Sequence, residues 1–157
     1  MTKTNDSGQA MIEFALAAMV FFLLVLGTMD FGNLFYHELT LQNAVRQAGR
    51  YAITGQCAGG VGSCSMSRTL SIQQVLETTS NGMINSSNVA SDVTIACTNE
   101  GGGCPTQAGG PGDTVTITVT YPYHLVTAPI AKFFSSGIYT MTLSASFTNE
   151  PFPPSQS

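Results

Sequence analysis

The stretch AMIEFALAAMVFFLLVLGTM, residues 10–29, decides how this chain of 157 residues is organised. Every residue from Phe14 to Leu26 is apolar, and Glu13 is the one charged residue of the run. A helix of about 20 residues is roughly 30 Å long, which matches the hydrocarbon thickness of a bilayer. The run therefore predicts a transmembrane helix over residues 9–29.

Two other interpretations of the run remain open from the residues alone. A cleaved signal peptide also places a short polar leader before an apolar stretch, but this run is long for one and no A-x-A-like site follows it. A buried core helix is the other alternative, although so short a chain could hardly surround so many consecutive apolar residues.

The helical pattern continues beyond the apolar run as an amphipathic segment over residues 30–54. No proline occurs before Pro105, and Gly55 is a plausible end of the helix. Apolar residues recur at helical spacing beside a separate polar row. The apolar stripe is Phe31, Leu34, Leu41, Val45, Ala48 and Ala52, and the polar row is Glu38, Gln42, Arg46 and Arg50. We expect one continuous helix whose second half packs on the domain that follows.

Composition argues against a nucleic-acid partner. The chain has 5 Lys+Arg against 9 Asp+Glu and a formal net charge of -4, so no basic surface for a phosphate backbone is expected. Mean hydropathy is +0.18, and the hydrophobic residues that raise it are concentrated in the first third of the chain. Beyond residue 55 the chain is rich in Gly, Ser, Thr and Asn, which is typical of exported domains.

Residues 55–150 predict a small α+β domain, followed by a proline-rich tail over residues 151–157. Strict alternation in DTVTITVTYP predicts a strand with threonines on its polar face. The predicted elements are a helix over 67–80 with Ser67 as its candidate N-cap, strands over 92–96, 113–122 and 139–149, and a short helix over 125–134. The residues expected to face the core are Leu70, Val75 and Leu76 of the helix, Val115, Ile117, Val119 and Tyr121 of the second strand, and Tyr139, Met141, Leu143, Ala145 and Phe147 of the third. Three antiparallel strands need a cover on one face, which the long helix would supply.

The four cysteines form two C-x6-C units, Cys57–Cys64 and Cys97–Cys104, each with glycines between. Four cysteines allow three pairings, of which local closure is the simplest. Each closure of so short a loop would contribute about 2.5 kcal/mol in the chain-entropy model. The spacing does not fit the usual zinc knuckles, and neither histidine is adjacent, so no metal site is expected. Disulfides would imply an oxidising compartment.

No catalytic constellation is evident. His37 lies on the polar side of the predicted helix and His124 follows a strand, and neither has a Ser, Cys or acid at a suggestive spacing. The Asp-Phe-Gly at 30–32 lacks the other kinase motifs, and Asp30 instead marks where the helix can leave lipid. We expect a protein that is not an enzyme and that uses no cofactor.

The N-terminal residues resemble a known family. Gly8-Gln9-Ala10-Met11-Ile12-Glu13-Phe14 is similar to the type IV prepilin cleavage motif, a glycine followed by a glutamate at the fifth mature position and an apolar helix. Residues 8–52 as a whole resemble the TadE-like (TadE/TadG) pseudopilins of the tight-adherence pilus system. The shared blocks are Glu13-Phe14, Asp30-Phe31-Gly32, Leu41-Gln42-Asn43-Ala44 and the Ala48–Ala52 stretch.

The resemblance implies a pilin-like fold and a function in pilus assembly. A prepilin peptidase would cut between Gly8 and Gln9, removing a leader over residues 1–8 on the cytoplasmic side. The C-terminal domain would then be periplasmic or extracellular on a single-pass inner-membrane anchor. The implied partners are the bilayer, other pilin subunits and an inner-membrane assembly platform. Gln9 departs from the Phe or Met of many pilins, which puts the efficiency of cleavage in question.

The same resemblance gives Glu13 a function, pairing with the new amino terminus of a neighbouring subunit. From the residues alone, Glu13 could instead reach the headgroups from one turn inside the membrane. Two functional alternatives also remain. One is an anchored binding or adhesion domain that never enters a filament, and the other is a type II secretion pseudopilin.

Overall fold

The computed structural model describes residues 6–58, 64–99, 101–104, 106–132 and 137–152. The first part of the predicted leader, the end of the predicted short helix and most of the tail lie outside these residues. Two compact units share the long helix: residues 1–35 with 124–139, and residues 36–123 with 140–157.

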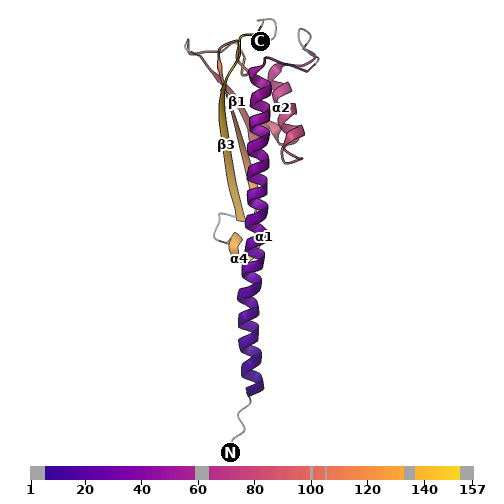
Figure 1. Cartoon of the computed structure of the whole chain (residues 1–157), viewed down its shortest axis with the longest axis vertical. Helices are drawn as coiled ribbons and strands as arrows, with labels where there is room; N and C mark the ends of the chain where they lie inside the picture. Colours follow the sequence, from indigo (N-terminus) through magenta and orange to yellow (C-terminus); the bar gives the residue numbers. More distant parts are fainter. Residues whose placement is uncertain (1–5, 59–63, 100, 105, 133–136, 153–157) are drawn as a thin grey trace, which may run out of the picture. The chain divides into compact units, whose positions relative to one another are not determined.

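The chain begins with one continuous helix, α1 (Asp6–Ile53), of 48 residues, drawn in indigo and purple in Figure 1. Its sequence is rich in Ala and Leu and contains no proline, so its backbone hydrogen bonds are uninterrupted. The helix ends just before Gly55, whose φ of 69° is the left-handed conformation that stops helices. The predicted continuous helix is therefore confirmed.

In the first unit, the N-terminal half of α1 is almost entirely exposed, apart from a patch near its end. There it meets the connection between two strands, which contains the short helix α4 (Ala128–Ala131). Gly27 is buried against this connection: a Cβ at Gly27 would lie 3.1 Å from Ile130 Cδ1. Figure 1 shows α4 beside α1 at this point.

The second unit contains most of a three-stranded antiparallel sheet in the order β1-β2-β3. Its strands are β1 (Val93–Thr98), β2 (Thr114–His124) and β3 (Ile138–Thr148). Ile95 pairs with Ile117 in the β1–β2 register. Across β2 and β3, hydroxyl pairs lie 2.8–3.5 Å apart on the face away from the core. The threonine face predicted for β2 is thus its polar face, and the α+β class is confirmed.

The core of the second unit lies between the sheet and the helices. Its fully buried apolar members come from α1, from α2 (Arg68–Thr79), from β2 and from two positions outside these elements. They are Leu41, Ala44, Ala48, Ala52, Ile72, Leu76, Ile84, Ala108, Val115, Ile117 and Val119. Gly49 lets α1 approach β3, because a Cβ there would overlap the Phe147 ring. In Figure 1 the sheet runs along the second half of α1, and α2 lies beside the same half.

Some predicted details were wrong. Ser67 caps α2 as expected, accepting from the Leu70 N–H at 3.3 Å, but Leu70 itself is exposed and Arg68 and Ser71 face the core instead. Tyr139 is 40% exposed, although it was expected to face inward. A four-residue helix, α3 (Val89–Asp92), precedes β1 and was not predicted. The buried face of a short helix is hard to predict from its sequence, because tertiary contacts and not periodicity determine which side is buried.

Candidate functional site

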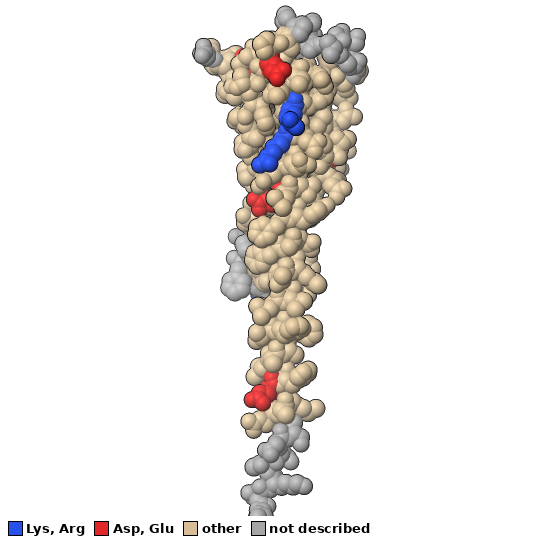
Figure 2. All heavy atoms as spheres, viewed as in Figure 1, with Lys and Arg blue, Asp and Glu red and all other residues tan. Residues whose placement is uncertain are grey.

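The N-terminal half of α1 presents apolar side chains to its surroundings on all sides. Met11, Phe14 and Met19 expose 76%, 75% and 67% of their surfaces. The helix from Gly8 onward is long and apolar enough to cross a membrane. Figure 2 shows this half as an almost uncharged surface that carries one acidic side chain.

The predicted cleavage and assembly residues lie in the first turns of this half. Gly8 and Gln9 are helical and exposed, and a Cβ at Gly8 would meet no atom within 4 Å. Glu13 is also exposed, four residues beyond Gln9 and so about 6 Å further along the helix axis. The part of the chain that the structure describes offers Glu13 no hydrogen bond or ion pair, so any partner would come from elsewhere.

Asp30 is buried, with 3% of its surface exposed, although it follows the apolar run directly. Its Oδ1 accepts from the Val126 backbone N–H at 3.2 Å, and its Oδ2 accepts from the Thr127 N–H at 2.7 Å. Hydrogen bonds to an ionised carboxylate are stronger than neutral ones. Asp30 therefore ties the β2–β3 connection to α1 across almost 100 residues of sequence.

The other two residues of the predicted exit motif behave differently from Asp30. Gly32 is exposed, with open space around the position of a Cβ. Phe31 is about half exposed and lines an open apolar groove beside α4. The residues of this groove are Leu23, Leu24, Gly27, Thr28, Phe31 and Ile130.

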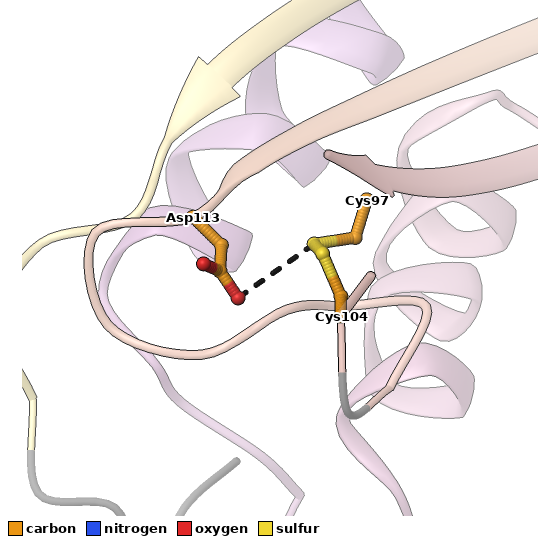
Figure 3. Close-up of side chains that lie close together, drawn as sticks. All are labelled: Cys97, Cys104 and Asp113. Atoms are coloured by element: carbon orange, nitrogen blue, oxygen red, sulfur yellow. Dashed lines mark hydrogen bonds between the residues drawn. A yellow bond between two sulfur atoms is a disulfide. The ribbon is translucent and has the colours of Figure 1, made fainter. Parts of the chain in front are cut away.

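The structure joins the four cysteines in the two local pairs, Cys57–Cys64 and Cys97–Cys104. Asp113 lies beside the second pair, with Oδ2 at 3.7 Å from Cys97 Sγ (Figure 3). A disulfide sulfur has no proton to donate, so this is a contact and not a hydrogen bond. The carboxylate instead accepts from the Gly110 N–H at 2.7 Å, which fixes the turn before β2.

Cys97, Cys104 and Asp113 lie close enough together to suggest a metal site. Sulfur ligates metals as the thiolate, however, and a closed disulfide provides none. With the disulfide formed, Asp113 is the only one of the three that retains a free ligand atom, and one carboxylate does not make a site.

Arg68 is a buried cation that sequence reasoning missed. Its guanidinium donates to the backbone carbonyls of Ala52, at 2.8 Å, and Gly109, and it lies 4.5 Å from the centroid of the Phe152 ring. Burial lowers the pKa of Arg68, while Tyr51 opposes that shift. Ala52 is in the last turn of α1, whose carbonyls lack helical partners, so Arg68 caps α1 and ties it to two distant segments.

His37 was placed on the polar side of the helix, which is wrong. Its ring packs against the sheet, 5.7 Å from the Tyr121 ring and 5.1 Å from the Tyr123 ring. His124 is exposed at the end of β2. His37 is therefore a packing residue, and His124 is a surface residue.

Comparisons with known proteins address the N-terminal helix. No curated protein and no solved structure matches the chain. The family model described as TadE-like protein matches residues 8–50, which is most of α1, and so the chain carries the TadE-like segment that its sequence resembled.

Proposed function

We propose that this protein is a membrane-anchored minor pilin or pseudopilin of a tight-adherence pilus system. A prepilin peptidase would cut it after Gly8, and the apolar half of α1 would hold it in the inner membrane and then pack against other subunits. The domain that follows would lie in the periplasm or outside the cell. The protein would work by assembly, without catalysis or a cofactor.

The observation that carries this proposal is the TadE-like match over a helix whose N-terminal half is almost entirely exposed. TadE-like segments point to the tight-adherence system in general. An uncovered apolar helix with a single acid suits both a bilayer and the interior of a helical filament, because each supplies an apolar environment.

The position of Glu13 supports a more specific role in assembly. Cleavage after Gly8 would create an amino group one turn from this carboxylate. An unpaired charge in lipid is costly, and a paired one is less so. A charge pair between neighbouring subunits would therefore favour the assembled state over isolated subunits in the membrane.

The mass of the protein extracted from membranes tests the processing step. We expect a chain that begins at Gln9, and we expect Gly8→Val to leave the leader attached. Gly32→Val is the matched control, since a Cβ at either glycine has open space. An unprocessed wild-type chain, or equal processing of both variants, would leave an anchored surface domain as the better interpretation.

The same preparations test the assembly charge with Glu13→Gln, which keeps the size and removes the charge. We expect this variant to be processed but to enter pili, or support piliation, at a small fraction of the wild-type level. Glu38→Gln, on the same helix, is the control. Normal piliation by the Glu13→Gln chain would contradict the role of this carboxylate.

A further inference from the structure

In the connection between β2 and β3, several backbone N–H groups donate hydrogen bonds to acceptors within the protein. Three consecutive residues each donate their N–H to another part of the first unit. Leu125 donates to the Gly137 carbonyl at 3.1 Å, and Val126 and Thr127 donate to the two carboxylate oxygens of Asp30. These N–H groups therefore need no water.

The next residues continue this pattern. Position 129 is proline, which has no N–H, and Ala131 donates to the Thr127 carbonyl at 2.9 Å. Irregular backbone is tolerated at membrane depth only where its polar groups have partners, because an unpaired one costs several kcal/mol in hydrocarbon. In residues 125–132, which we call the interface loop, the N–H groups of Leu125, Val126, Thr127 and Ala131 meet that condition.

The interface loop lies beside the end of the apolar run. Ile130 contacts α1 at Gly27, three residues before Asp30 and so about 4.5 Å further toward the N-terminus along the axis. Gly27 belongs to the predicted transmembrane stretch. If α1 crosses a bilayer with residues 10–29 in its core, Ile130 lies at the depth of the last turn inside it.

The charge pattern of the loop also fits a lipid surface. No acidic residue occurs between Asp113 and Glu150, and Lys132 is the one Lys or Arg in that interval. Val126 exposes 81% of its surface, the most of any large apolar side chain described. Lys132 is exposed at the end of α4, where its long side chain can reach phosphate groups.

We infer that the interface loop is a second lipid-contacting element of this protein. It enters the headgroup region beside α1, with Val126 toward the acyl chains, Ile130 packed against α1 at Gly27, and Lys132 toward lipid phosphates. Asp30 is the positioning residue that holds the loop at this depth. This inference depends on α1 lying in a bilayer and does not depend on leader processing or on a pilus.

The test is the depth of a fluorophore in reconstituted vesicles. All four native cysteines are in disulfides, so Val126→Cys introduces a single free thiol for labelling. The full chain is placed in vesicles of phosphatidylethanolamine and phosphatidylglycerol that carry nitroxide-labelled lipid, and iodide serves as the aqueous quencher. Leu70→Cys, exposed on α2, is the aqueous control, and Leu16→Cys is the membrane control.

We expect the label at position 126 to be quenched several-fold more by shallow nitroxide lipid than the label at position 70, and several-fold less by iodide. Equal behaviour at positions 126 and 70 would overturn the inference. A label at 126 that is shielded from iodide but not quenched by lipid would also overturn it, since a second copy of the chain would then cover the loop.

Asp30→Asn in the labelled background tests the positioning residue, because an amide offers one acceptor oxygen in place of two. We expect lipid quenching at position 126 to fall toward the level at position 70, with quenching at position 16 and helix content unchanged. Glu77→Gln is the matched acid-to-amide control. Unchanged quenching in Asp30→Asn would show that this carboxylate does not set the depth of the loop.

Discussion

Leu24 and Leu41 belong to one helix, yet Leu24 exposes 63% of its surface and Leu41 exposes none. The same contrast extends to the residues around them. In the N-terminal half of α1 apolar residues point in all directions, whereas in the C-terminal half they form a stripe that the sheet covers. A helix that is apolar all round is suited to an environment that is apolar all round.

The contrast shows that one helix meets two different requirements. The C-terminal half gains its stability from packing within the second unit, so removing buried atoms there should weaken the fold. The N-terminal half has few protein contacts to lose among the described residues, and under the proposed function its requirement is compatibility with lipid or with neighbouring subunits. Substitutions at equal exposure but in different halves can separate these requirements.

The largest expected effect comes from truncating the two leucines. Leu41→Ala should lower the free energy of unfolding of the C-terminal domain by about 2–5 kcal/mol, because it leaves a cavity in the core. Leu24→Ala should change it by less than about 0.5 kcal/mol. The measurement is denaturation in detergent micelles followed by the near-ultraviolet circular dichroism of the tyrosines. Similar losses in both variants would contradict the division of the helix.

The features that sequence predicted correctly are those that depend on local pattern. Uninterrupted helical spacing gave α1, and strict alternation gave β2 with Val115, Ile117 and Val119 on the buried face. Ser67 was identified as the cap of α2 by residue type and position alone. The local cysteine pairs follow from short glycine-containing loops, for which closure is easy.

The features that sequence missed depend on contacts between distant segments. Arg68 joins Ala52 and Gly109, and Asp30 holds two N–H groups of the interface loop. The partners of Arg68 and Asp30 are backbone carbonyl and N–H groups. Every residue has such groups, so the sequence does not show which of them will be partners. One signal for Asp30 is present in the sequence, because an acid at the edge of an apolar run needs a partner.

The buried face of α2 shows a second reason why sequence alone does not predict which residues are buried. Leu70 is exposed while Arg68 and Ser71 are buried, which reverses what hydrophobicity predicts. Arg68 is stable there because carbonyls accept from it and the Phe152 ring stacks on it. Burial of a charge depends on partners that appear only when the chain has folded.

The second prediction compares two leucines of α1 that are equally exposed but lie in different halves of the helix. Leu24 and Leu39 expose 63% and 65% of their surfaces, one in each half of α1. Leu24→Arg should disfavour membrane insertion by up to about 3 kcal/mol, whereas Leu39→Arg should change it by less than about 0.5 kcal/mol. The fraction of newly made chain that inserts into membrane vesicles measures both. Equal insertion would place Leu24 outside the lipid.

The smallest expected effect has opposite signs at two glycines of α1. Gly49→Ala places a methyl group against the Phe147 ring, and overpacking typically costs about 1–3 kcal/mol. The higher helix propensity of alanine returns up to about 1 kcal/mol, so we expect a net loss of about 1–2 kcal/mol. Gly32→Ala meets no atom within 4 Å, so it should gain helix propensity without a packing loss.

Thermal unfolding in detergent would measure both variants, and a second substitution separates packing from backbone effects. If the loss in Gly49→Ala comes from the aromatic ring, Phe147→Leu in the same chain should recover part of it, because a smaller side chain leaves room for the methyl group. If Gly49→Ala is as stable as Gly32→Ala, then α1 can move away from β3 without penalty. The C-terminal half of the helix would then be held less closely than its buried stripe indicates.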